Sequence, residues 1–157
     1  MITRALLFAT LWSLCAVCSA DQRVVPGAKN VGEFLAMGQM AVASSRVGYC
    51  VTAMPSRKRE LRAELASFRA KFNDAIKPTL ERISRSATLS RPIPDGLVDT
   101  FQAQMDGGLQ EFRKAEAGAV CESVLDALKN ATVSSIRGLS EQALDGYEEA
   151  VQDGVIH

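Results

Sequence analysis

The sequence predicts an all-α protein, an antiparallel bundle of about four helices with one inter-helix disulfide. Three observations support this fold class. Apolar residues recur at spacings of three and four over much of the chain, as they do on one face of a helix. No segment alternates apolar and polar residues for long enough to indicate a strand. Two cysteines, Cys50 and Cys121, remain in the part of the chain that is expected to fold.

Residues 1–20 show the order of charge, apolar run and small residues that is typical of a cleavable signal peptide. Arg4 precedes an apolar-to-small run over 5–17, and small residues follow at 18–20. This run of 13 residues is shorter than the roughly 20 that a membrane-spanning helix needs. The sequence therefore predicts an exported protein, periplasmic or secreted, whose mature chain begins near Asp21.

The remaining part of the chain, 21–157, has the length of a single helical domain. Hydrophobic residues make up 47% of the sequence, a normal share for a globular protein, so wholesale disorder is not expected. No segment after residue 20 is apolar enough to cross a bilayer. We therefore do not expect an integral membrane protein.

Cys50 and Cys121 are expected to form the disulfide. Cys15 and Cys18 leave with the signal peptide, and two cysteines in an exported chain pair most simply with each other. A catalytic thiol is the alternative, but it needs a basic partner, and the only histidine is His157 at the C-terminus. The bond would hold the first and third helical regions side by side.

The first two helices are expected over about 31–53 and 57–87. Asn30 and Glu33 have the spacing of a capping box at the start of the first. Its apolar residues point in nearly all directions, as in a helix that is central in its bundle or covered by a partner. Only Glu33 and Arg46 are charged between residues 31 and 54. The second helix has the clearest amphipathic pattern of the chain, and Pro78 inside it predicts a kink.

A third helical region is expected over about 95–136, as one long helix or with a break at the glycine pair 107–108. Gly138 would end this region. Ser140 would then open a last helix over about 140–152.

Charge is unevenly distributed along a chain of zero net charge. Residues 57–91 hold ten Lys or Arg against four Asp or Glu, whereas residues 95–157 hold four against twelve. One interpretation is a face for an anion or an acidic partner, formed by Arg57, Lys58, Arg59, Arg62 and Arg69. The other is that the basic second helix lies beside an acidic later helix. Nucleic acid is not an expected partner, because the chain is neutral overall and lacks aromatic residues among these basic ones.

Acidic residues share helix faces at two places, Glu122 with Asp126 and Asp145 with Glu148 and Glu149. Helical di-metal sites pair such carboxylates with histidine at a Glu-x-x-His spacing, which is missing here. Nucleophile motifs and phosphate-binding glycine loops are also missing. We therefore expect no metal, no cofactor and no enzyme activity.

Two functions stay open, and neither partner is identified. The leading hypothesis is a non-enzymatic exported protein that binds another macromolecule. The alternative is a carrier that holds an apolar or amphiphilic ligand between its helices, with an adaptable lining formed by Met37, Met40, Met54 and Met105. A hydrolase built on Glu122 and Asp126 is a third possibility. An exposed apolar patch would favour a protein partner, and a cavity would favour a ligand.

Overall fold

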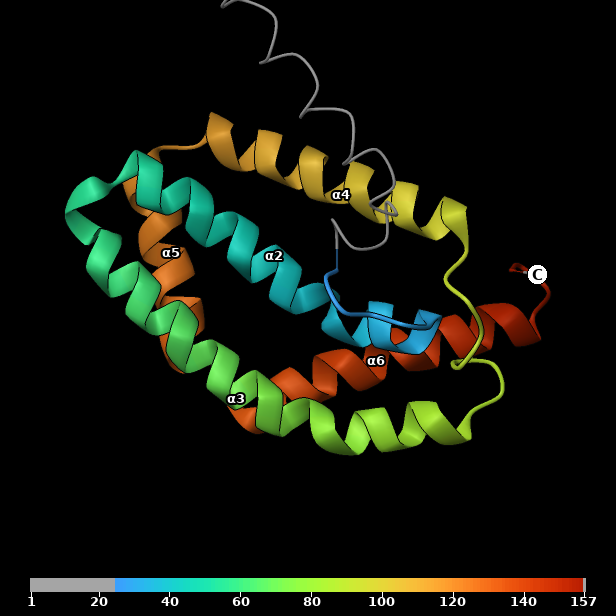
Figure 1. Cartoon of the computed structure of the whole chain (residues 1–157). Helices are drawn as coiled ribbons and strands as arrows, with labels where there is room; N and C mark the ends of the chain where they lie inside the picture. The colour runs from blue at the N-terminus through green and yellow to red at the C-terminus, as the bar shows by residue number, and fades with distance from the viewer. Residues whose placement is uncertain (1–24, 157) are drawn as a thin grey trace, which may run out of the picture.

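The computed structural model describes residues 25–156, and these form a bundle of helices (Figure 1). The elements in chain order are α2 (Val31–Ala53), the 3₁₀ helix η1 (Pro55–Arg57), α3 (Lys58–Arg85), α4 (Asp95–Lys114), α5 (Ala117–Asn130) and α6 (Val133–Gln152). Residues 25–156 contain no strand, so the predicted all-α class is confirmed. None of the described helices is long and apolar enough to cross a membrane. The expected signal peptide, 1–20, lies outside the described residues.

α2 begins at the predicted N-cap, Asn30, but the predicted capping box is not completed, because the Glu33 carboxylate accepts from Lys29 and not from Asn30. Asn30 Oδ1 accepts the N–H of Glu33 at 2.9 Å, and the carboxylate of Glu33 accepts the N–H of Lys29 at 2.7 Å. The N–H of Gly32 donates to the carbonyl of Leu89 in the loop between α3 and α4, also at 2.9 Å. The first turn of α2 is therefore anchored on a loop almost 60 residues further along the chain, as well as on its own cap.

α3 buries one face along its whole length. The buried residues of this helix are Leu61, Phe68, Phe72, Ala75, Ile76, Thr79 and Ile83. Pro78 lies inside the helix and removes one backbone donor without ending it. Figure 1 shows α3 bending along its length, as expected for a helix with an internal proline.

The prediction of one helical region over 95–136 is wrong. The chain leaves the helical conformation at 115–116 and again at 131–132. The glycine pair 107–108 lies inside α4, and Gly138 lies inside α6. The helices therefore do not end at the glycines where the sequence predicted that they could end.

Packing against α2 accounts for the first break. The ring of Phe112 on α4 meets the ring of Tyr49 at 5.4 Å, while Cys121 on α5 is bonded to Cys50, the next residue of α2. In an unbroken helix, residues 112 and 121 would stand about 13 Å apart along the axis. They reach adjacent positions on α2 only because the chain turns between them.

A reciprocal cap sets the start of α6. Thr132 Oγ1 accepts the N–H of Ser135 at 3.1 Å, and Ser135 Oγ accepts the N–H of Thr132 at 3.0 Å. The prediction that Ser140 opens the last helix is wrong, because its hydroxyl is buried and donates to the carbonyl of Ala36 instead. Ser140 thus contributes to the contact between α6 and α2.

Four of the helices, α2, α3, α5 and α6, supply most of one hydrophobic core, while α4 lies to one side. Val98 is the one buried residue that α4 contributes. α4 packs on α2 through aromatic contacts, such as Phe101 edge-on to Phe34 with 5.3 Å between ring centroids, and through aliphatic residues such as Val98. Figure 1 shows α4 on the opposite side of α2 from α3.

Candidate functional site

The middle of α2, residues 39–45, is half-buried throughout and borders two cavities. The larger cavity measures about 520 Å³ and is called the groove below. Its lining is mainly apolar and comes from all five helices, including Val42, Phe68, Phe112, Leu128, Ile136 and Leu139. The volume falls within the range of about 300–1,000 Å³ that is usual for small-molecule sites. The groove is therefore the candidate site.

The smaller cavity, about 140 Å³, lies between α2 and α4. Val42 and Arg46, one helical turn apart, line both cavities, so the two adjoin along this part of α2. Met105 lines the smaller cavity, whereas Met37 and Met40 pack against the core. The adaptable methionine lining that the sequence suggested is thus limited to one residue of the smaller cavity.

Arg46 is the one charged residue in the lining of either cavity. Its side chain is exposed, and its Cζ lies 5.9 Å from the centroid of the Phe112 ring, within the range of a cation–π contact. Arg46 forms no ion pair with any residue of 25–156. Arg46 was not among the predicted site residues, although it is a lone charge in the middle of an apolar helix.

Two polar side chains of the groove are engaged within the protein. Gln39 Nε2 donates to the carbonyl of Ile136 at 3.0 Å and to Ser140 Oγ at 2.6 Å. Ser135 is held in the capping box of α6. The other polar residues of the lining, Ser123 and Asn130, are exposed, so the rest of the groove is apolar apart from Arg46.

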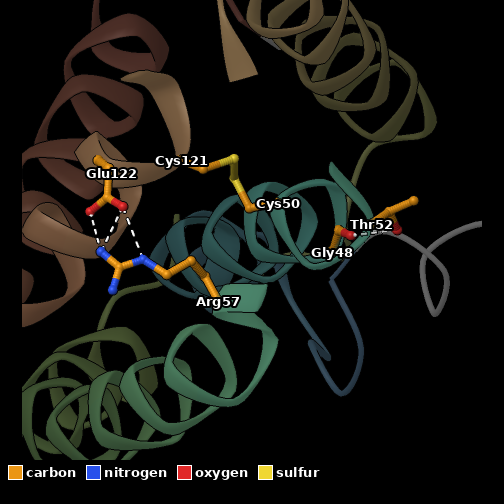
Figure 2. The surroundings of a disulfide bond; sticks show 6 residues. All are labelled: Gly48, Cys50, Thr52, Arg57, Cys121 and Glu122. Carbon is orange, nitrogen blue, oxygen red and sulfur yellow. Dashed lines mark hydrogen bonds and ion pairs between the residues drawn. A yellow bond between two sulfur atoms is a disulfide. The ribbon is translucent and has the colours of Figure 1, made fainter. Parts of the chain in front are cut away.

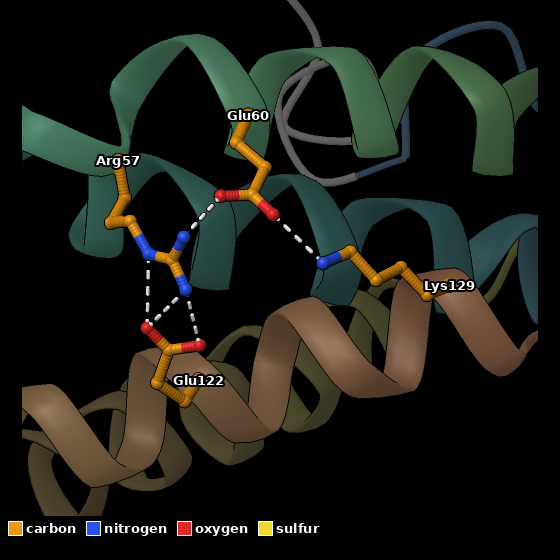
Figure 3. Close-up of polar contacts among 4 residues, drawn as sticks. All are labelled: Arg57, Glu60, Glu122 and Lys129. Carbon is orange, nitrogen blue, oxygen red and sulfur yellow. Dashed lines mark hydrogen bonds and ion pairs between the residues drawn. The ribbon is translucent and has the colours of Figure 1, made fainter.

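The predicted basic face divides into one paired residue and four exposed ones. The guanidinium of Arg57 donates to both carboxylate oxygens of Glu122, at 2.6 and 2.7 Å, and also pairs with Glu60 (Figure 3). Lys129 pairs with the other oxygen of Glu60 at 2.7 Å. The hydrogen bond from Lys129, followed by the charge of Arg57, lowers the pKa of Glu60. Arg57 thus links η1 to α3 and α5.

Lys58, Arg59, Arg62 and Arg69 are exposed on α3. The first three surround a surface hollow at the start of this helix. These residues lie on the outside of the bundle, away from the groove lining. Their role in binding an anion or an acidic partner stays a prediction.

The basic second helix lies beside an acidic later helix, as the second interpretation of the charge pattern expected. Arg82 on α3 pairs with Glu141, Asp145 and Glu148, all on α6, and the last two distances are 2.6 Å. Ser86 Oγ also donates to Glu148 at 2.6 Å. The hydroxyl of Ser86 and then the guanidinium of Arg82 lower the pKa of Glu148. The acidic residues of this face therefore serve packing between α3 and α6.

The predicted disulfide between Cys50 and Cys121 is confirmed (Figure 2). The two Cα atoms are 5.5 Å apart, and both residues are fully buried. The bond joins the end of α2 to the first turns of α5, beside the ion pair of Arg57 with Glu122. This junction fixes the groove at the end where α2 meets α5.

Within the described part of the chain, no group of three or more His, Cys, Asp or Glu side chains is placed to hold a metal ion. Glu122 is occupied by Arg57, and Asp126 is exposed on α5. No protein-family model matches the sequence, and no curated protein or solved structure matches it either. The function must therefore be inferred from the chain's own geometry.

Proposed function

We propose that this chain is an exported, non-enzymatic binding protein that holds the apolar part of a small amphiphilic molecule in the groove. The observation that carries this proposal is the groove itself, a cavity of about 520 Å³ with a mainly apolar lining drawn from five helices. Burying apolar ligand surface in such a site gives about 25 cal/mol per Å² of favourable free energy. The proposal adopts the ligand-carrier alternative of the sequence analysis.

The exposed apolar residues also favour a small ligand over a protein partner. Within residues 25–156, the large hydrophobic residues that are exposed are Leu80, Leu139 and Val155. They lie on α3, on α6 and beyond the end of α6. A stable protein interface usually has a continuous apolar centre, for which three such residues are few. Leu139, 58% exposed, belongs to the groove lining.

Export is supported by two features. The order of residues in 1–20 is that of a signal peptide, and the buried Cys50–Cys121 disulfide is the kind of bond that persists in oxidising compartments. A protein outside the cytoplasm that shields the apolar part of a small molecule from water would carry or sequester that molecule.

The experiment is a binding assay on the mature chain with Nile red, a neutral apolar dye, and decanol as its competitor. Ala127→Trp places a large side chain in the groove lining, and Ala119→Trp makes the same change at an exposed site of the same helix outside it. We expect decanol to displace the dye from the wild type, and Ala127→Trp alone to weaken binding at least about tenfold, or about 1.4 kcal/mol. Failure of the wild type to bind either molecule, or equal effects of the two variants, would overturn the proposal. Circular dichroism and thermal melts establish that both variants fold.

A further inference from the structure

We infer that the ligand of the groove is a free single-chain amphiphile with an anionic head group, and that Arg46 binds this head group at the rim. The inference rests on the proposed function of the groove and adds the charge of its ligand. It assigns a role to the one charge that the middle of α2 carries.

Arg46 is the only charged residue lining the groove or the smaller cavity beside it. It has no ion-pair partner among residues 25–156, whereas Arg57 and Arg82 each pair with more than one carboxylate. A cation beside an apolar channel, with no partner from these residues, is complementary to a molecule that has an anion at the end of an apolar chain.

Two aromatic rings orient the guanidinium of Arg46. The guanidinium of Arg46 lies over the ring of Phe112, and that ring is held edge-on by Tyr49 at 5.4 Å between centroids. All three residues come from α2 and α4 close to the disulfide that anchors α5. A guanidinium that is already placed loses less freedom when it binds, and its planar fork matches a carboxylate or a phosphate.

Arg46 lies closer to solvent than the buried apolar residues of the groove. Arg46 is exposed, while Leu128 and Ile136, which also line the groove, are buried. A head group at Arg46 therefore stays in contact with water, and the attached chain reaches the buried apolar residues. Gln39, deeper in the lining, already donates both of its hydrogen bonds within the protein. Arg46 is thus the residue of the groove that is best placed to recognise charge.

A free molecule fits better than a membrane surface or a second copy of the chain. Either of those would require a broad apolar face around the groove mouth. Of the exposed large hydrophobic residues in 25–156, only Leu139 lies at the groove. A single exposed apolar residue beside the groove is enough for the entry of one alkyl chain.

The test compares decanoate with decanol, which share the chain length and differ in the head group, by calorimetric titration of the mature protein at neutral pH. Arg46→Met removes the charge but keeps an apolar side chain against Phe112. Arg137→Met is the matched control, because Arg137 is exposed on α6, has no ion-pair partner in 25–156 and does not line the groove. Decanoate is expected to bind the wild type about two- to fivefold more tightly than decanol, as one exposed ion pair would give.

Arg46→Met should abolish this preference, and Arg137→Met should retain it. Equal binding of decanoate and decanol to the wild type, or a preference that survives in Arg46→Met, would overturn the inference while the proposed function stands. Tighter binding to lipid vesicles than to free decanoate, or a protein that dimerises in light scattering, would overturn the assignment of a free ligand. Absence of binding by both molecules would overturn the proposed function as well.

Discussion

Arg57 and Glu122 hold η1 against α5 through two charged hydrogen bonds of 2.6 and 2.7 Å, with a third at 3.0 Å from Arg57 Nε. Glu122 follows Cys121 directly in the sequence, so this ion pair and the disulfide act on the same turn of α5 (Figure 2). One link is covalent and buried, and the other is polar and half-exposed. Together they fix α5 to the turn between α2 and α3.

Loss of the disulfide should destabilise the protein without unfolding it. Cys50 and Cys121 are 71 residues apart, and closing a loop of that length stabilises a fold by about 4 kcal/mol on the chain-entropy account. We expect the free energy of unfolding of Cys50→Ala/Cys121→Ala, measured in urea, to fall by about 3–4 kcal/mol. The wild type under reducing conditions is the control and should lose a similar amount. A loss below about 1 kcal/mol in both would show that the bond contributes little.

Two glycines of the helices should respond to alanine in opposite directions. A Cβ at Gly32 would lie 2.8 Å from Ile83 Cγ1 and 2.9 Å from Leu89 Cβ, whereas a Cβ at Gly107 would have no neighbour within 4 Å. Gly32→Ala should therefore lower the free energy of unfolding by about 1–3 kcal/mol through overpacking. Gly107→Ala should raise it by about 0.4–1 kcal/mol, because alanine has the higher helix propensity. Changes of the same sign in urea denaturation would contradict the close contact at Gly32.

Arg82 should stabilise the contact of α3 with α6 more than an ordinary surface arginine does. Arg82→Met would leave Glu141, Asp145 and Glu148 facing one another without their cation. The side chain is 30% exposed, so solvent screens the pairs, and we expect a loss of about 1–2 kcal/mol in urea denaturation. Arg85→Met, an exposed site near the end of the same helix, should cost less than about 0.5 kcal/mol. Equal losses of unfolding free energy in the two variants would show that the ion pairs of Arg82 do not stabilise the contact of α3 with α6.

Acid should destabilise the protein in the range where glutamate titrates. The pKa values of Glu60 and Glu148 are lowered from 4.5 in the folded chain, so the folded state binds fewer protons than the unfolded state as the pH falls. Their contribution is complete above an unfolded pKa of about 4.5 and is lost as the pH drops through the lower folded values.

Urea midpoints measured between neutral pH and pH 3 test this expectation. Glu148→Gln should flatten the acid slope of the wild type, because it removes one of the shifted groups. Glu149→Gln should leave the slope unchanged, because Glu149 is exposed on the same helix and pairs with no residue of 25–156. A slope that is identical in all three proteins would show that other groups control acid unfolding.

The sequence predicted the first two helices closely because their signals are local. Asn30 caps α2, and α3 runs over 58–85 against a predicted 57–87. The third region was mispredicted because its breaks depend on long-range packing. Only the contacts of Phe112 and Cys121 with α2 require the turn between α4 and α5. The glycines at 107–108 lower the helix propensity of the sequence, but the chain stays helical there because no long-range contact requires a turn at that point.

The groove was beyond sequence reasoning for a similar reason. Its lining comes from five helices, and no spacing within one helix indicates which of their faces meet. The basic face on α3 was visible as a run of charge, whereas Arg46 was a single residue in an apolar helix. Arg46 can be recognised as a site residue only from the structure, in which Phe112 and Leu128 line the same groove.

The most direct test of the central claim is methyl NMR of the mature chain during titration with decanoate. We predict saturable chemical-shift changes at the methyl groups of Val42, Leu128 and Ile136, which line the groove from three helices. The methyl groups of Leu80, exposed on α3 outside the groove, should not shift. The account would be contradicted if the groove methyl groups stayed unchanged while decanoate bound, or if the shifts centred on Leu80.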